Sequence, residues 1–339
     1  MSLSVGIVGL ANVGKSTLFE ALTKKQVNIS NYPFCTIEPN IGIVEVPDER
    51  VDKLAAAFNS VKKIPAIIKF VDIAGLVRGA NKGEGLGNQF LANIREMDAL
   101  LFVVRCFENA EIMHVEKTID PARDIDIVNM ELILKDLETV DKRMQKAKEP
   151  EEQAFFRKLK AWLEQGNLAR QLRSEVGAPA ETSEFLKELQ LLTDKPSIFI
   201  LNSNTSELPP ALVKKIKELN SEYIIANLRD EFDASKLTEE DKKELGLGES
   251  KLGEIVKKSY QALGLITFFT TGPDETRAWT IKQGTLAPQA SGVIHTDFEK
   301  KFICALVINW EKLLNKELPQ TQGKEYAVLD GDVIEVKHG

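Results

Sequence analysis

Residues 9–16 read Gly-Leu-Ala-Asn-Val-Gly-Lys-Ser, two glycines separated by four residues and followed directly by lysine and serine. An apolar run at 3–9 leads into this loop, and helical spacing begins at Lys15. Such glycines let the backbone point N–H groups at phosphate oxygens, and the start of a helix adds partial positive charge. Lys15 can reach the β- and γ-phosphates, while the Ser16 hydroxyl can bind Mg²⁺. In this strand–loop–helix setting, the motif predicts a nucleoside triphosphate site.

Two further segments have residue types that can respond to a γ-phosphate. Asp72-Ile73-Ala74-Gly75 follows an apolar run, so we expect Asp72 to hold Mg²⁺ through water and the Gly75 N–H to contact the γ-phosphate. Upstream, Thr36 lies in the polar loop NYPFCTIEPN, where its hydroxyl would complete the Mg²⁺ shell in the triphosphate state only. Loss of the γ-phosphate would then release both loops. Either segment alone is more often an ordinary turn, but their order after the glycine-rich loop favours a switch.

The segment after the apolar run at 197–201 lacks the residues that recognise guanine. Guanine recognition needs the order N-K-x-D, in which the aspartate accepts hydrogen bonds from the base. The order at 202–205 is N-S-N-T, so Thr205 stands where a carboxylate is needed. An NKGE segment at 81–84 resembles the motif, but it follows D-x-x-G too closely to read a base. A guanine preference is therefore unsupported.

The residues available for hydrolysis also depart from the usual pattern. Leu76 follows D-x-x-G, where many nucleotide switches carry a glutamine that orients water, and leucine cannot do this. His114, in the loop at 109–117, can accept or donate a proton near neutral pH. A loop histidine without a catalytic role is the alternative. Asn12 is a candidate to help seat a monovalent cation such as K⁺ against the phosphates.

The chain has 339 residues, which favours two or three domains, and 43% of them are hydrophobic. No apolar run is long enough to span a bilayer, and the start MSLSVGIVGL lacks the features of a secretory signal. We therefore expect a cytoplasmic protein with no membrane partner. The three cysteines are widely separated, which argues against a disulfide framework or zinc site. The formal net charge of −7 argues against nucleic-acid binding by bulk electrostatics, and we expect no DNA partner.

Short apolar, β-branched runs alternate with helical segments over much of the chain. The runs lie at 41–46, 67–71, 100–104, 197–201 and 223–226. This alternation predicts a mainly parallel sheet with helices on both faces, an α/β class of the P-loop NTPase, G-domain-like type. We assign this nucleotide domain to 1–123 and 175–262.

Between these two parts the sequence becomes helical throughout. Ile133, Leu137, Val140, Met144 and Ala147 follow the 4-3-4-3 spacing of a coiled-coil seam. A similar stripe, made of Phe155, Leu159 and Trp162, begins after Pro150. We predict an inserted antiparallel helical hairpin at 124–174. Two amphipathic helices packed on the sheet are the alternative.

From about residue 263 onward the chain consists of strand-like segments broken by glycine and proline. These segments are ITFFTTG, RAWTIKQG, FICALVI and YAVLDGDVIEVK, with a single helix expected around 297–302. They predict a small, β-rich carboxy-terminal domain at 263–339.

Four stretches closely resemble the Obg-like ATPase (YchF) family of translation-associated P-loop proteins. They are GLANVGKSTLFEALT, NYPFCTIEPN, DIAGLVRGANKGEGLGNQFL and CFENAEIMHV. GVIHTDFEKKFICALVI and DGDVI resemble the family's carboxy-terminal β-grasp domain, of the TGS type. The resemblance covers nearly the whole chain. It implies a slow ATPase switch that prefers ATP over GTP, binds the ribosome, with the large subunit as the expected contact, and acts in translation or stress responses.

The resemblance also implies roles for individual residues. It assigns phosphate binding to Asn12, Val13, Gly14, Lys15, Ser16 and Thr17, Mg²⁺ binding to Ser16 and Thr36, and promotion of hydrolysis to His114. Asn202 and Ser203 would lie beside the base. Thr205 departs from the family, which usually has glutamate there in an N-x-x-E pattern, and Ala11 stands where proline is common.

Two other functions fit the same sequence. One is a GTPase of the related Obg group, which competition between ATP and GTP would reveal. The other is a ribosome- or RNA-binding module whose nucleotide site is structural, which an absence of ribosome-stimulated turnover would reveal. Whichever of these functions holds, we expect the chain to be a monomer.

Overall fold

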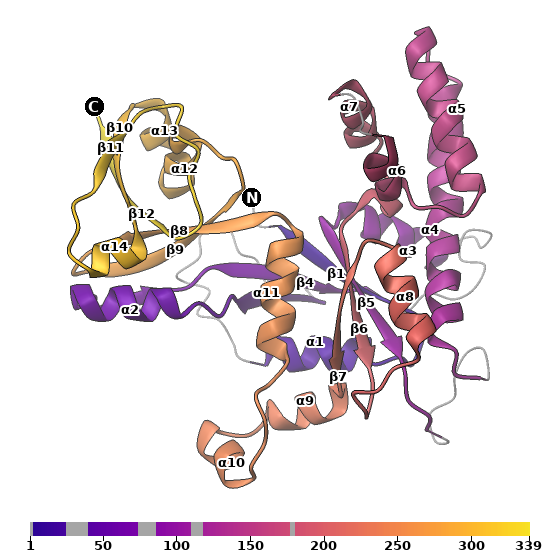
Figure 1. Ribbon diagram of the computed structural model, residues 1–339, viewed down its shortest axis with the longest axis horizontal. Coiled ribbons are helices and arrows are strands. Elements are labelled where there is room, and N and C mark those ends of the chain that lie inside the picture. The colour runs from indigo at the N-terminus through magenta and orange to yellow at the C-terminus, as the bar shows by residue number, and fades with distance from the viewer. Residues whose placement is uncertain (1–2, 25–39, 74–85, 110–117, 177–179) are drawn as a thin grey trace.

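The computed structural model describes residues 3–24, 40–73, 86–109, 118–176 and 180–339. Figure 1 shows three regions: a central sheet with its helices, a helical projection above it, and a second sheet on the other side of the molecule. Among the described residues, no helix has both the length and the apolar composition needed to cross a bilayer.

The central sheet has six strands in the order β2-β4-β1-β5-β6-β7. The strands are β1 (Ser4–Val8), β2 (Ile41–Glu45), β4 (Ile67–Asp72), β5 (Ala99–Arg105), β6 (Ser197–Asn202) and β7 (Glu222–Ala226). All neighbours are parallel except β2, which runs antiparallel to β4. The predicted mainly parallel sheet is therefore confirmed. Every residue of β5 and β6 is buried, which explains why these strands read as continuous apolar runs.

Helices cover both faces of this sheet (Figure 1). One face carries α1 (Lys15–Thr23) and α11 (Leu252–Ala262), and the other carries α3 (Leu86–Glu96), α4 (Pro121–Met144) and α8 (Pro210–Glu218). Two shorter helices, α9 (Leu228–Ala234) and α10 (Glu239–Glu244), follow β7. The carboxyl ends of β1, β4, β5 and β6 lie at the same edge of the sheet, where ligands of these folds bind.

The helical projection is built from the upper part of α4 and from α5 (Pro150–Glu164). The seam has its own hydrophobic core, in which Ile133, Val140, Ala147, Phe156, Leu159 and Leu163 are buried and Leu137, Met144, Phe155 and Trp162 are partly buried. The predicted hairpin is present, and α6 (Ala169–Val176) and α7 (Ala180–Leu189) follow it. The first turns of α4 instead pack into the core of the central sheet through Ile125, Val128 and Leu132. The alternative of packing on the sheet therefore holds for the start of α4.

The second sheet has the order β11-β10-β12-β8-β9-β3. Its carboxy-terminal strands are β8 (Leu265–Thr271), β9 (Glu275–Lys282), β10 (Phe302–Asn309), β11 (Gln320–Gln322) and β12 (Asp332–His338). β8 is antiparallel to β9 and parallel to β12, and β12 is antiparallel to β10. This order, with a helical segment between the β8–β9 and β10–β11 hairpins, is that of the predicted β-grasp fold.

The expectation of a single helix around 297–302 is wrong. The described carboxy-terminal residues form three helices, α12 (Ala287–Ile294), α13 (Thr296–Lys300) and α14 (Trp310–Leu314), and β10 already begins at Phe302. The buried residues of α12 are Ala287, Ala290 and Ser291. Because these side chains are small, they give almost no hydrophobic periodicity, and the helix could not be recognised from its pattern.

One strand of the second sheet comes from early in the chain. β3 (Lys62–Ile64), which follows α2 (Glu49–Phe58), pairs in parallel with β9. The carboxy-terminal sheet is therefore completed by residues that follow β2 of the central sheet. The remaining element is a short 3₁₀ helix (Leu192–Asp194) before β6.

Candidate nucleotide-binding site

The loop between β1 and α1 depends on backbone conformations that glycine favours. Gly9 and Gly14 have φ angles of 150° and 106°. A Cβ atom on Gly9 would lie 2.5 Å from the Val103 carbonyl oxygen, and one on Gly14 would lie 2.7 Å from Asn202 Nδ2. A side chain at Gly9 would therefore require the backbone of β5 to move, and one at Gly14 would displace the Asn202 amide. Asn12, at the exposed tip of the loop, is left-handed with φ 62°.

Lys15 is held against this loop by its own ammonium group. Its Nζ donates a 2.7 Å hydrogen bond to the Leu10 carbonyl oxygen, and the residue is only 7% exposed. Burial lowers the pKa of Lys15 to about 8, while the charge of Asp72 acts in the opposite direction. The ammonium group is thus a partly desolvated cation, which interacts strongly with an approaching phosphate.

Ser16 and Asp72 meet at the ends of two neighbouring strands. β1 and β4 pair with Ile7 beside Asp72, so the first turn of α1 lies next to the end of β4. The Ser16 hydroxyl donates a 3.0 Å hydrogen bond to Asp72 Oδ2. A hydroxyl and a carboxylate are oxygen ligands of the kind Mg²⁺ prefers, and Mg²⁺ usually keeps waters and phosphate oxygens as its other ligands. The pair supplies only two oxygen atoms, so it fits Mg²⁺ that is bound together with phosphates.

Asn202 joins the phosphate loop to the start of α9. Its Nδ2 donates to the Val13 carbonyl oxygen at 3.0 Å, and its Oδ1 accepts from the Leu228 N–H at 3.1 Å. Ser203 is also buried, and its hydroxyl oxygen accepts a hydrogen bond from the Thr205 N–H. The Thr205 hydroxyl turns to the Glu207 carbonyl oxygen.

The structure brings most of the predicted site residues together. Asn12, Val13, Gly14, Lys15, Ser16 and Thr17 form the loop and the first turn of α1. Asp72 ends β4, which is next to β1, and Asn202 ends β6, with Ser203 directly after it. Thr36, Gly75 and His114 lie outside the described residues.

Arg105 is a site-proximal residue that sequence reasoning missed. It ends the apolar strand β5 and is only 1% exposed. Its guanidinium donates to the carbonyl oxygens of Phe107 and Asn109, at 3.1 and 3.2 Å, and lies over the Phe107 ring. Arg105 thereby fixes the start of the segment that leads toward His114. The available signal was an arginine at the end of an otherwise wholly apolar strand.

The fold and this arrangement define a P-loop nucleotide hydrolase of the GTPase-like class. Residues 4–152 match a family described as "50S ribosome-binding GTPase", and residues 265–339 match the YchF-GTPase_C family, described as a protein of unknown function. Two proteins named "Ribosome-binding ATPase YchF", from Bacillus subtilis and Escherichia coli O157:H7, are 45% and 44% identical to this chain. Each alignment covers 98% of this chain and 98% of the relative. The chain belongs to the YchF family.

The likeness extends to the whole three-dimensional structure. The solved structure of the Schizosaccharomyces pombe YchF GTPase is 38% identical and superimposes with a TM-score of 0.86, covering 99% of this chain and 98% of that one. The resemblance seen in the sequence motifs is thus confirmed over the full fold.

Proposed function

We propose that this chain is a Mg²⁺-dependent switch that binds and slowly hydrolyses ATP and acts on the ribosome. The observation that carries the proposal is the contact between Ser16 and Asp72 beside the buried ammonium group of Lys15. This arrangement places one cation and two oxygen ligands beside a glycine-rich loop. Bacterial relatives that share 98% of their length with this chain are named ribosome-binding ATPases.

In this proposal, residues 12–17 hold the phosphates through backbone N–H groups and the Lys15 charge. Mg²⁺, when bound, neutralises phosphate charge, and Ser16 and Asp72 are its ligands from the described residues. Thr36 would complete the metal shell and the Gly75 N–H would contact the γ-phosphate, so that both loops depend on the triphosphate. Mant-ATP binding with and without EDTA tests the metal requirement. Equal affinities in the two conditions would contradict it.

For the base, we propose a preference for ATP over GTP, with Asn202 and Ser203 beside it. Its support is Thr205, whose hydroxyl is turned to a carbonyl oxygen and which carries no carboxylate for guanine. One missing acceptor is worth about 1–3 kcal/mol, so the preference should be modest. Calorimetric titration with ATP and with GTP tests it. Equal or reversed affinities would favour an Obg-type GTPase. The S. pombe structure is itself named a GTPase.

For hydrolysis, we propose that His114 positions or deprotonates the attacking water, because Leu76 cannot. Asn12 would help to seat K⁺ where an arginine finger acts in other switches. Turnover should then be faster in potassium than in sodium chloride at equal ionic strength. Identical rates in the two salts would remove the role of K⁺.

For its partner, we propose the ribosome, through the large subunit, with the chain acting as a cytoplasmic monomer in translation or stress responses. Sedimentation with separated large and small subunits, in ATP and in ADP, tests this. Binding to neither subunit would contradict it. Ribosomes should also stimulate turnover. A bound chain with unstimulated turnover would instead indicate a structural nucleotide site.

A further inference from the structure

A cavity of about 480 Å³ lies at the end of α1 that is farther from the phosphate loop. Its apolar wall is formed by Ala21, Leu22, Val44, Pro47, Leu252 and Val256. These residues come from α1, β2, the turn after β2 and α11. Pockets of about 300–1,000 Å³ with mainly apolar walls are typical of small-molecule sites. Lys15 and Ser16 lie at the opposite end of α1, and none of the described residues of the nucleotide site lines the cavity.

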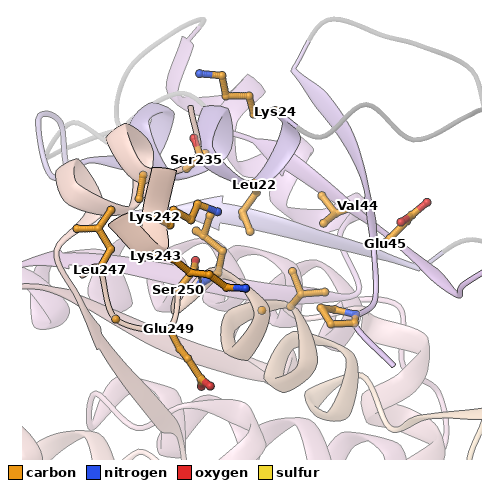
Figure 2. A pocket seen from close by; sticks show the side chains of 17 residues that line it. Leu22, Lys24, Val44, Glu45, Ser235, Lys242, Lys243, Leu247, Glu249 and Ser250 are labelled. Atoms are coloured by element: carbon orange, nitrogen blue, oxygen red, sulfur yellow. Dashed lines mark hydrogen bonds between the residues drawn. The ribbon is translucent and has the colours of Figure 1, made fainter. Parts of the chain in front are cut away.

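The charged groups around this cavity are arranged asymmetrically. Figure 2 shows the side chains of Lys242 and Lys243, from α10, extending toward Leu22 over the cavity. The carboxylates of Glu45 and Glu249 turn outward, away from it. The cavity therefore offers two ammonium groups at its mouth on a chain whose formal net charge is −7.

The serine hydroxyls that line the cavity already have acceptors. Ser235 Oγ donates to the Phe232 carbonyl oxygen at 2.7 Å, and Ser250 Oγ donates to Glu231 Oε2 at 2.6 Å. A ligand would thus meet mainly apolar surface and the two ammonium groups. An apolar body gains free energy by leaving water for such a wall, and an anionic group gains Coulomb energy beside the lysines.

We propose that this cavity binds a small organic anion with an apolar body, whose charged group lies at Lys242 and Lys243. An uncharged ligand of the same shape would use the wall but not the lysines. A ligand without an apolar body would use the lysines alone, which give little affinity by themselves.

A pair of fluorescent probes separates these two contributions. Anilinonaphthalene sulfonate has an aromatic body and one negative charge, and phenylnaphthylamine is its uncharged analogue. Both probes become fluorescent when they enter an apolar site. Titrations of the full chain should show one saturable site for each, with the charged probe bound about tenfold more tightly.

The chain offers a substitution that fills the cavity from within a helix. Gly253 lies in the first turn of α11, and a Cβ atom there would meet only Pro47 Cγ, at an ordinary contact distance of 3.7 Å. Gly253→Phe should therefore place its ring in the cavity, and Gly253→Leu is a smaller filler in case phenylalanine disturbs folding. We expect either filler to weaken both probes by at least about tenfold.

The double substitution Lys242→Glu with Lys243→Glu tests the charge. It should weaken the sulfonate by about 10- to 100-fold and change the uncharged probe by less than about twofold. Lys158→Glu is the control for charge reversal at a distance, because it makes half of this charge change on an exposed residue of α5. Circular dichroism and mant-ATP affinity verify that each variant is folded.

Three outcomes would overturn the proposal. The proposal is overturned if both fillers are folded and leave the affinity of the sulfonate within twofold of the parent. It is also overturned if the double lysine variant weakens both probes equally or neither. Loss of sulfonate binding in Lys158→Glu would show a general charge effect and would overturn it as well.

Discussion

The side-chain amide of Asn202 donates a 3.0 Å hydrogen bond to the Val13 carbonyl oxygen and accepts one from the Leu228 N–H. One buried side chain at the end of β6 therefore links the phosphate loop to the start of α9, the helix that follows β7. Gly14 packs so closely against this amide that a Cβ atom on it would lie 2.7 Å from Nδ2. The position of the phosphate loop thus depends on a residue far from it in the sequence.

Asn202→Asp should lower both stability and nucleotide affinity. Aspartate keeps an acceptor for Leu228 but places a second acceptor opposite the Val13 carbonyl oxygen, so one buried hydrogen bond becomes a repulsion. We expect a loss of about 1–3 kcal/mol in the free energy of unfolding and a matching rise in the Kd for ATP. Urea denaturation and calorimetric titration measure the two effects. Asn204→Asp, at a neighbouring exposed residue, is the matched control. Equal behaviour of the two variants would contradict the linking role of Asn202.

Lys15→Ala should abolish nucleotide binding or weaken it by at least about 100-fold, because it removes the cation that faces the phosphates. The fold should persist, since the ammonium group makes its hydrogen bond within the loop, to Leu10. Fluorescent nucleotide titration with circular dichroism is the measurement, and Lys158→Ala is the control. A folded variant that still binds with micromolar affinity would refute the phosphate-binding role.

His114→Ala should lower kcat for ATP by about 10- to 1000-fold, the effect of losing one acid–base or water-positioning group. Nucleotide affinity should change by less than about threefold, because the side chain would act on water and not on ground-state phosphates. Single-turnover hydrolysis at saturating ATP measures the first effect. Arg105→Lys, which would loosen the start of the same segment, should give a smaller loss in kcat. A parental rate in His114→Ala would make this histidine an ordinary loop residue.

Local patterns in the sequence were sufficient for the central sheet and the phosphate loop. Continuous apolar runs mark β5 and β6 because both faces of these strands are covered, and the glycines of the loop have conformations that other residues rarely adopt. The 4-3-4-3 spacing of apolar residues likewise predicted the helical hairpin. Each of these features is fixed by residues close together in the chain.

Features that depend on distant contacts could not be predicted. β3 contains only Lys62, Lys63 and Ile64, which is too short for a visible alternation, and its partner β9 follows some two hundred residues later. The double hydrogen bonding of Asn202 depends on β6 and β7 being neighbours. The site residues that respond to the γ-phosphate, Thr36 and Gly75, stay predictions.

A buried carboxylate makes the attachment of the projecting helices sensitive to pH. Asp136 of α4 is fully buried and accepts hydrogen bonds from the Leu192 N–H and from the N–H and hydroxyl of Thr193, which lie just before β6. Burial raises the pKa of Asp136 to about 6, against the opposing effects of these hydrogen bonds and of Arg95. The folded state therefore holds this proton more tightly than the unfolded state. Its contribution to the free energy of unfolding should fall as pH rises from about 4 to 6 and stay level above that.

Asp136→Asn removes this titration, so the stability difference between parent and variant should be larger at pH 5 than at pH 7. At both pH values the variant should be less stable, because its NH₂ group faces a backbone N–H and leaves a buried donor unpaired, at a cost of about 1–3 kcal/mol. Urea denaturation followed by tryptophan fluorescence measures both quantities, and Asp141→Asn, on the exposed side of α4, is the control. A difference that does not change with pH would show that Asp136 does not titrate in this range.

Arg50 connects α2 to the carboxy-terminal domain. Its guanidinium is paired with Asp48 at 2.7 Å and with Asp330 at 2.6 Å, and it lies over the ring of Phe269. Asp330 in turn accepts a hydrogen bond from the Thr267 N–H of β8. Because α2 follows β2 of the central sheet and leads into β3 of the second sheet, this cluster lies at the junction of the two sheets.

Arg50→Ala should therefore loosen the second sheet and leave the nucleotide site intact. We expect amide hydrogen exchange in β3, β8 and β9 to rise by about 10- to 100-fold, equivalent to about 1–3 kcal/mol of lost local stability. Arg50→Lys keeps the charge but cannot bridge both aspartates with a planar fork, so it should give an intermediate increase. In a double-mutant cycle with Asp330→Ala, the two losses should be non-additive, because both remove the same contact. Glu49→Ala, in the first turn of α2, removes an exposed ion pair with Lys53; it is the control and should leave exchange in β8 unchanged. Additive losses from Arg50→Ala and Asp330→Ala would show that the two residues act independently, and the junction would then depend on the pairing of β3 with β9.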